Sequence, residues 1–293
     1  GGVHLVGGTQ TLTGVNTYSG ATTVDNGAVL ALAGTGSVAL SSGVTNNGTL
    51  DISATTNGAS LTGLTGLGTV SLGARTLTLT QAAGIFSGTI AGTGGLTLNG
   101  GTQTLAGANT YTGATTINAG TLALVAGGQL SSATTVTLAG SGATFDVSAA
   151  GALTLSGLSG AAGTRFAIGA STLTVDAATD ATYAGDLAGS GVFVKQGTGM
   201  LVLNGTSSAF TGTTNVGAGT LEIGDAAHES AVQGGNVAVG SQGTLRGHGT
   251  ILGNVTNGGI VAPGGSIGTL SVAGNYTQAS NAALAIEVSP TTA

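Results

Sequence analysis

The short segment GDAAHESAVQGG contains an acid, a base and a hydroxyl group. These are Asp225, His228 and Ser230, with Glu229 beside them. A carboxylate, an imidazole and a nucleophile are the components of a hydrolytic triad. Residues so close in sequence rarely converge as a triad, so we interpret the segment as a solvated loop between strands.

A second group of charges resembles the acid-base clusters that act on polysaccharides in some β-helix enzymes. Asp176, Asp180 and Asp186 form the densest acidic stretch of the chain, and Arg165 and Lys195 flank it. Isolated charges in a chain so poor in charged residues also serve solubility. We therefore predict that these five residues are solubilising surface charges.

Metal and cofactor chemistry lacks the residues it needs. The chain has no Cys, which excludes a thiolate nucleophile or metal ligand. His4 and His248 are far apart in sequence and have no acidic neighbours, so we expect both at exposed corners. Lys195 is followed by Gln196, which excludes a phosphate-binding Gly-Lys-Ser/Thr loop. We predict no catalytic, cofactor or metal site, and a protein that is not an enzyme.

Composition defines the fold class. Of 293 residues, 58 are Gly and only 5% are charged, compared with about 25% charged in typical soluble domains. Gly disfavours helix, whereas the abundant Thr, Val, Ile and Leu suit strands. The 41% hydrophobic content argues against a flexible linker. A net charge of −6 argues against nucleic-acid partners.

Three copies of one segment organise the chain: VNTYSGATTVDNGAVLA at 15–31, ANTYTGATTINAGTLAL at 108–124 and SSAFTGTTNVGAGTLEI at 207–223. In each copy an aromatic residue is followed by two glycines at fixed spacing. We predict structural roles for these residues, which are Tyr18, Gly20 and Gly27, then Tyr111, Gly113 and Gly120, then Phe210, Gly212 and Gly219.

Short strand signals bounded by Gly or Asn recur throughout the repeats. The alternation at 76–80 places Leu77 and Leu79 inward and the threonines outward. A β-propeller and a stacked β-helix both fit such repeats. We favour the β-helix, a single elongated rod with about 20 residues per turn, because propeller blades need longer strands and more aromatic residues. Gly and Asn are expected at corners that require positive φ.

The C-terminal stretch 236–289 resembles the autochaperone-like end of autotransporter passengers. The matching elements include Gly243-Thr244-Leu245, the turn Pro263-Gly264-Gly265-Ser266, Gly268-Thr269-Leu270 and Gly274-Asn275-Tyr276. The three upstream copies resemble the autotransporter-associated β-strand repeat. The resemblance adds Pro263, Gly264, Gly268 and Tyr276 to the residues for which we predict structural roles.

The resemblance implies a right-handed parallel β-helix exported by type V secretion. It divides the chain into a repetitive stalk at 1–235 and an autochaperone-like end at 236–293. The partner it implies is the protein's own C-terminal β-barrel, which we expect outside this chain. The expected location is the surface of a Gram-negative bacterium, with the passenger attached to the outer membrane or secreted. We also hypothesise that 236–293 folds first and templates the preceding turn.

The function we expect is adhesion, self-association or biofilm formation by a surface stalk. The partners would be a host surface, extracellular matrix or the same protein on neighbouring cells. Two alternatives remain: a carrier for an enzymatic domain outside this fragment, and a β-helix that binds or degrades glycans. An array of outward threonines, as at Thr76–Thr80, leads to one further hypothesis, which is that the chain binds ice or an extended glycan.

Overall fold

The computed structural model describes residues 1–265 and 267–288. Ser266, at the end of the predicted turn, and residues 289–293 lie outside the described residues. Within the described ranges the regular structure consists of β-strands, and no helix there is long and apolar enough to cross a membrane. The described chain is therefore all-β, as its composition predicts.

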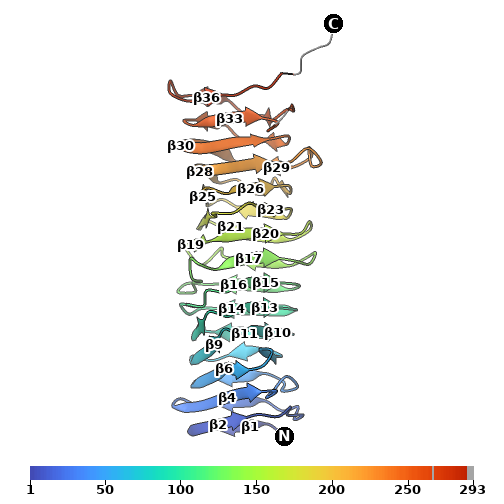
Figure 1. The fold of residues 1–293 in the computed structure, drawn as a ribbon, viewed down its shortest axis with the longest axis vertical. Coiled ribbons are helices and arrows are strands. Elements are labelled where there is room, and N and C mark those ends of the chain that lie inside the picture. The colour runs from blue at the N-terminus through green and yellow to red at the C-terminus, as the bar shows by residue number, and fades with distance from the viewer. Residues whose placement is uncertain (266, 289–293) are drawn as a thin grey trace. The chain divides into compact units, whose positions relative to one another are not determined.

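The chain forms two compact units, Gly1–Ala150 and Gly151–Ala293. Figure 1 shows short strands stacked in successive layers within each unit. The division of the chain into a stalk at 1–235 and an end at 236–293 stays a prediction.

The N-terminal unit coils through three faces in each turn. The first face contains β1 (Val3–Leu5), β3 (Thr22–Val24), β5 (Val44–Asn46) and β8 (Leu64–Thr65), then β11 (Ala82–Phe86), β14 (Gly101–Leu105), β16 (Thr121–Leu124) and β18 (Thr144–Asp146). The second contains β2 (Gly8–Leu12), β4 (Ala28–Gly34), β6 (Thr49–Thr55), β9 (Thr69–Gly73) and β12 (Thr89–Gly92). The third contains β7 (Ala59–Leu61), β10 (Leu77–Leu79), β13 (Leu96–Leu98), β15 (Thr115–Ile117) and β17 (Thr135–Leu138).

Every strand pairs in parallel with the strand one turn away. Val3 is opposite Thr22, and Leu77 is opposite Leu96. One turn of the solenoid therefore contains about 20 residues, and successive turns lie at the usual spacing of neighbouring strands. This arrangement confirms the parallel β-solenoid. The right-handed coiling stays a prediction.

The core of the N-terminal unit is made of apolar side chains stacked turn upon turn. One such column contains Leu61, Leu79, Leu98, Ile117 and Leu138, each at most 1% exposed. Fully burying one side chain of this kind stabilises the fold by about 1.5–3 kcal/mol before entropic losses. Leu77 is also buried, while Thr78 and Thr80 are only partly buried and Thr76 is exposed. The predicted alternation is confirmed.

The repeats do not begin on a fixed face. The first copy places β3 in the sheet of β1, β5 and β8, whereas the second copy places the matching strand, β15, in the sheet of β13 and β17. The distance from the first copy to the second is therefore not a whole number of turns.

The C-terminal unit repeats the same parallel stacking. Its strands are β19 (Ala152–Leu155), β20 (Gly157–Gly160), β21 (Arg165–Gly169), β22 (Thr172–Asp176), β23 (Ala181–Tyr183), β24 (Asp186–Gly189), β25 (Val192–Gln196), β26 (Met200–Leu203), β27 (Thr206–Ser207), β28 (Thr213–Ile223), β29 (Val232–Gln233), β30 (Asn236–Gly247), β31 (Thr250–Ile251), β32 (Val255–Asn257), β33 (Ile260–Pro263), β34 (Ser271–Val272), β35 (Tyr276–Gln278) and β36 (Ala283–Leu284). The long strand β28 serves two faces, because its first half pairs with β25 and its second half with β26.

Glycines at one series of corners form a column. A Cβ atom added to Gly68, Gly88 or Gly107 would collide with the carbonyl oxygen of Gly48, Gly68 or Gly88, one turn earlier. None of these four glycines has positive φ. Here Gly is required by the close approach of two backbones, a role that the sequence alone does not indicate.

Positive φ explains other glycines but no asparagine. Gly27 and Gly58 have φ of 81° and 84°, as expected for glycine corners. Among the described residues no residue other than Gly has positive φ, so the expectation for Asn is wrong. Asn side chains instead connect turns: Oδ1 of Asn47 accepts a hydrogen bond from the Leu67 N–H, and Oδ1 of Asn236 accepts one from Asn254.

The glycine column predicts the outcome of a matched pair of substitutions. Gly88→Ala should destabilise the N-terminal unit by about 1–3 kcal/mol, because the methyl group overlaps backbone and the Phe86 ring. Gly43→Ala should be neutral or stabilising by up to about 1 kcal/mol, since its Cβ would meet no atom within 4 Å. Urea unfolding followed by circular dichroism measures both. Equal effects of the two changes would contradict the backbone-contact explanation.

Candidate functional site

The loop after β28 brings together an acid and a base but no nucleophile. His228 Nδ1 lies 2.6 Å from Asp225 Oδ1, and Asn204 Nδ2 donates a 2.8 Å hydrogen bond to Asp225 Oδ2. The hydrogen bond with His228 is the main cause that lowers the pKa of Asp225. Ser230 and Glu229 are exposed, and no hydrogen bond joins either to His228 in the described structure. The arrangement fits the predicted solvated loop.

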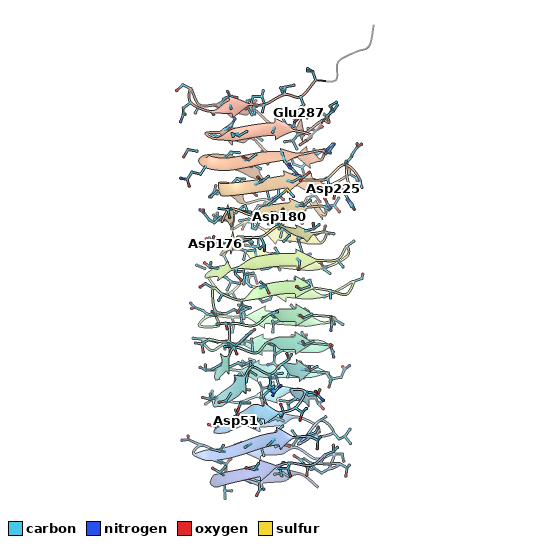
Figure 2. The ribbon with its side chains drawn as sticks, in the orientation of Figure 1. Asp51, Asp176, Asp180, Asp225 and Glu287 are labelled. Carbon is cyan, nitrogen blue, oxygen red and sulfur yellow. The ribbon has the colours of Figure 1, made fainter. Side chains whose placement is uncertain are left out.

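The acidic stretch does not converge on a site. Asp180 Oδ1 accepts a 2.8 Å hydrogen bond from the Met200 N–H, and Asp186 Oδ1 accepts a 2.7 Å bond from Thr206. Asp176 is exposed. Figure 2 labels Asp176 and Asp180 on the ribbon. Two of the three carboxylates therefore connect one turn to the next, which is a structural role beyond the predicted solubilising one.

Lys195 is not a surface charge, and this prediction is wrong. The residue is fully buried, and its Nζ donates hydrogen bonds to the carbonyls of Gln196 at 2.6 Å, Gly197 at 3.1 Å and Ala218 at 3.4 Å. These carbonyls belong to the corners of two successive turns. Three acceptors match the three donors of an ammonium group, so the buried charge is solvated by backbone.

Comparison of the repeats shows how the lysine came to face inward. Lys195 is opposite Val216, whereas the matching pair in the second repeat is Leu98 and Ile117. The lysine therefore occupies a core position of the repeat. Burial lowers the pKa of Lys195, and Asp176 and Asp180 oppose that shift.

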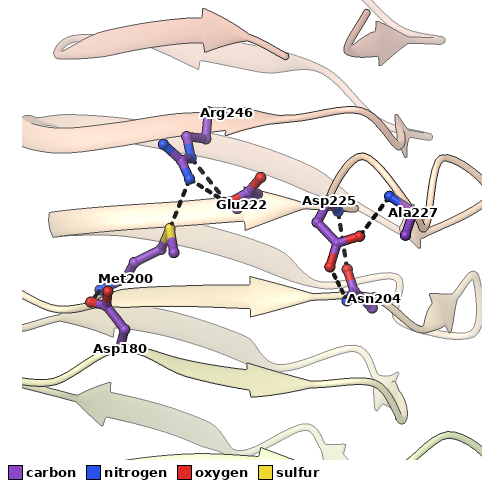
Figure 3. Close-up of polar contacts among 7 residues, drawn as sticks. All are labelled: Asp180, Met200, Asn204, Glu222, Asp225, Ala227 and Arg246. Carbon is purple, nitrogen blue, oxygen red and sulfur yellow. Dashed lines mark hydrogen bonds and ion pairs between the residues drawn. The ribbon is translucent and has the colours of Figure 1, made fainter. Parts of the chain in front are cut away.

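A buried carboxylate, Glu222, lies on the outward side of the neighbouring strands and pairs with the partly buried Arg246. Arg246 donates to Glu222 Oε2 through Nη2 at 2.7 Å and Nε at 3.0 Å, and its Nη2 also lies 3.1 Å from the Met200 sulfur (Figure 3). These residues come from β30, β28 and β26. The sequence alone does not reveal this contact, because its partners are separated by a whole turn or more.

The prediction that His4 and His248 are exposed and have no acidic neighbours holds only in part. His4 is exposed, but its Nε2 lies 2.8 Å from Asp25 Oδ2, a residue one turn later. His248 is partly buried rather than exposed. Residues 1–265 and 267–288 contain no group of three or more His, Cys, Asp or Glu residues that could hold a metal ion.

The aromatic residues of the three copies share one position and differ in their hydrogen bonds. The hydroxyls of Tyr18 and Thr22 lie 2.7 Å apart, and those of Tyr111 and Thr115 lie 2.6 Å apart. Phe210 has no hydroxyl, and in that copy Gln233 Nε2 donates to the hydroxyl of Thr214 at 2.9 Å. A buried threonine thus has a partner in every copy.

The glycines of the copies occupy two kinds of position. A Cβ on the first glycine of each copy, Gly20, Gly113 or Gly212, would collide with backbone of the preceding turn. The second glycines have positive φ, at 81° for Gly27, 82° for Gly120 and 65° for Gly219. Their structural roles stay predictions until they are substituted.

The residues predicted from the C-terminal resemblance lie on β33, β35 and the connection between them. Pro263 is opposite Gly247, and Gly264, with φ of 85°, donates to the Gly247 carbonyl. A Cβ on Gly268 would meet the ring of His248. Asn257 Nδ2 donates to the Tyr276 hydroxyl at 3.0 Å.

The outward side of the third face carries a ladder of hydroxyl groups, which we call the hydroxyl ladder. Parallel register aligns one Ser and four Thr, each partly buried, on successive strands: Ser60, Thr78, Thr97, Thr116 and Thr137. Neighbouring members are separated by the strand spacing of about 4.8 Å. A surface of this kind offers many equal, weak polar contacts rather than one pocket.

Stacked parallel turns and outward hydroxyl groups define a repetitive β-solenoid with a polar surface. The family model described as passenger-associated-transport-repeat matches residues 7–32, 99–124 and 193–223. These ranges contain the three copies found in the sequence. The chain therefore contains passenger-associated-transport repeats, and the match supports its interpretation as part of an autotransporter passenger. Passengers of this kind are surface-exposed or secreted parts of Gram-negative bacterial proteins.

One similar protein is the "Adhesin BmaC autotransporter" of Brucella suis biovar 1 (strain 1330). It is 37% identical over 108 residues, which cover 37% of this chain and 3% of that protein. The chain thus corresponds to a small part of this relative. No solved structure matches the chain.

The buried lysine predicts a pH dependence. The pKa of Lys195 is lower in the folded chain than its ordinary value of about 10.4. As the pH rises toward that value, Lys195 keeps its proton in the unfolded chain more than in the folded chain. The contribution of Lys195 to the free energy of unfolding therefore rises with pH. Urea unfolding from neutral pH upward should show wild type gaining stability relative to Lys195→Met. Gln196→Met, at the next position, should not change the pH dependence.

This comparison should stay below about pH 10. Burial raises the pKa of Tyr111 and of Tyr183, so ionisation of these tyrosines in the unfolded chain lowers stability above that pH. If the difference in free energy of unfolding between wild type and Lys195→Met is constant over this pH range, folding does not change the pKa of Lys195.

Proposed function

We propose that this passenger segment is adhesive and binds surfaces through its outward polar faces. The observation that carries the proposal is the hydroxyl ladder, in which five hydroxyl residues are aligned on adjacent strands of one face. Ligands with repeated polar groups would meet several members at once. Many weak contacts then add to a durable attachment.

The similar protein from Brucella suis supports this proposal, because it is named an adhesin. Self-association between neighbouring cells and biofilm formation use the same chemistry, since a second copy presents an identical face. A host surface or extracellular matrix is the other partner we propose. The segment would be held at the outer membrane through the protein's own C-terminal β-barrel.

We assign no catalytic role to the segment. Among the described residues no hydrogen bond joins Ser230 to the Asp225–His228 pair, and Asp180 and Asp186 are engaged by backbone N–H groups of the next turn. These contacts favour an adhesive passenger over the glycan-degrading alternative.

Adhesion can be tested on a non-adherent bacterium that displays residues 1–293 on a β-barrel. The double variant Thr78→Lys with Thr116→Lys places two long, positively charged side chains on the hydroxyl ladder, two turns apart. We expect attachment or settling to fall by at least about tenfold, because the loss of several linked contacts is multiplicative. Cell counts on coated surfaces and settling rates measure the effect.

The matched control is Ala31→Lys with Ser71→Lys, which places the same charges two turns apart on outward, partly buried positions of β4 and β9, on the second face of the same unit. Equal surface exposure of all variants is checked with antibody. If the two double variants attach equally well, the hydroxyl ladder is not the adhesive surface. If wild type does not attach at all, the segment is a stalk.

We further propose that residues 236–293 promote folding of the passenger during secretion. Strand β30 supports this idea, since it pairs with β28 along both faces that β28 serves. A folded C-terminal turn would offer β28 a complete template, and repeat proteins propagate order between neighbours.

Deletion of residues 236–293 should therefore reduce the exported, protease-resistant passenger by at least about tenfold. Deletion of residues 1–58 removes the same length of chain and should leave export unchanged. Limited proteolysis of whole cells followed by immunoblotting measures both. Unchanged export and protease resistance after the C-terminal deletion would contradict the templating proposal.

A further inference from the structure

The chain contains six Asn-Gly dipeptides, a sequence prone to spontaneous deamidation. The backbone nitrogen of Gly attacks the side-chain carbonyl carbon of Asn, a C–N bond forms, and ammonia leaves to give a succinimide. Water then opens the ring to aspartate or isoaspartate. The reaction needs an accessible Gly N–H and a mobile Asn side chain. The six are Asn26–Gly27, Asn47–Gly48, Asn57–Gly58, Asn99–Gly100, Asn204–Gly205 and Asn257–Gly258.

Asn257 is held most firmly. Its side chain is fully buried, and Nδ2 donates to the Tyr276 hydroxyl at 3.0 Å and to the Ala283 carbonyl at 2.8 Å. Oδ1 accepts from the Gly259 N–H at 3.0 Å. The attacking N–H of Gly258 is itself engaged, because it donates to Val239 at 2.7 Å. Neither reactant is available without local unfolding.

Asn47 and Asn204 are held by neighbouring turns. The Gly48 N–H donates to the Val24 carbonyl, while Asn47 Oδ1 accepts from Leu67. Both ends of the Asn204 amide form hydrogen bonds with Asp225. Nδ2 donates to Asp225 Oδ2 at 2.8 Å, and Oδ1 accepts from the Asp225 N–H at 3.1 Å.

Asn99 is held through one atom, because its Oδ1 accepts from Asn118 Nδ2 at 2.8 Å. Gly100, which follows it, is buried. This dipeptide is intermediate between the firmly held sites and the open ones.

Asn26 and Asn57 are open. Both side chains are exposed, and in the described structure neither amide has a hydrogen-bond partner, nor does the N–H of Gly27 or Gly58. A Cβ on Gly27 would meet no atom within 4 Å. Asn57 also lines a shallow recess of about 280 Å³ beside Thr35 and Thr78.

We propose that Asn26 and Asn57 are sites of spontaneous deamidation in the folded passenger and that Asn47, Asn204 and Asn257 are protected by their contacts. Each conversion replaces a neutral amide by a carboxylate, which adds one negative charge to a chain of net charge −6. At Asn57 the new charge lies in the recess beside Thr78, a member of the hydroxyl ladder. The chemistry requires only water.

The test incubates the folded chain at neutral and mildly alkaline pH, digests it with pepsin in acid and measures deamidated peptides by mass spectrometry. Asn26 and Asn57 should react at least about tenfold faster than Asn47, Asn204 and Asn257, because those three must first open locally. In denaturant all six should react at similar rates, since the protecting contacts are then absent.

Two variants complete the test. Asn26→Gln and Asn57→Gln should each abolish the mass gain of one peptide and leave the other unchanged. The proposal is overturned if Asn26 and Asn57 do not react in the folded chain, if a protected asparagine reacts equally fast there, or if the folded-state order persists in denaturant. The result does not depend on whether the passenger is adhesive.

Discussion

The structure depends on how closely one turn of backbone lies on the next. At the glycine column of the N-terminal unit a carbonyl oxygen occupies the space that a Cβ would need one turn later. The C-terminal unit has an equivalent series at Gly191, Gly212, Gly235, Gly253 and Gly274. Continuous parallel pairing around these corners is what aligns the apolar columns inside and the hydroxyl ladder outside. The high glycine content thus reflects this steric requirement together with corners of positive φ.

Close stacking also explains the polar side chains that were hardest to interpret. Corners interrupt the strand ladder, so backbone groups there need other partners. Asn47, Asp180 and Asp186 each accept a hydrogen bond from an N–H of the following turn. Lys195 does the reverse and donates to the carbonyls of two corners. Most of the few charged and amide groups are therefore parts of the scaffold.

The sequence was sufficient to predict the short strands and the inward leucines, because alternation is a local signal. Repetition favoured a β-helix over a propeller, and the parallel pairing of the strands was implied by the family resemblance. The sequence was insufficient for Lys195, for the His4–Asp25 contact and for the Arg246–Glu222 pair. In each of these the deciding partner lies about one turn away, and a turn has no fixed length in residues. Asn at corners was misjudged for the same reason, since its role is visible only when the next turn is in place. The hydroxyl ladder likewise required the register of five strands.

The mismatch between repeat length and turn length has an evolutionary consequence. Matching strands of the first two copies, β3 and β15, lie on different faces, yet both bury the same kind of apolar residue, as Val24 and Ile117. The interior therefore accepts the same unit in either orientation about the axis. Unequal recombination between the first two copies would add or remove a unit without disrupting the core, and it would turn every later face to a new direction. The length of the passenger and the directions in which its faces point would then vary together among strains.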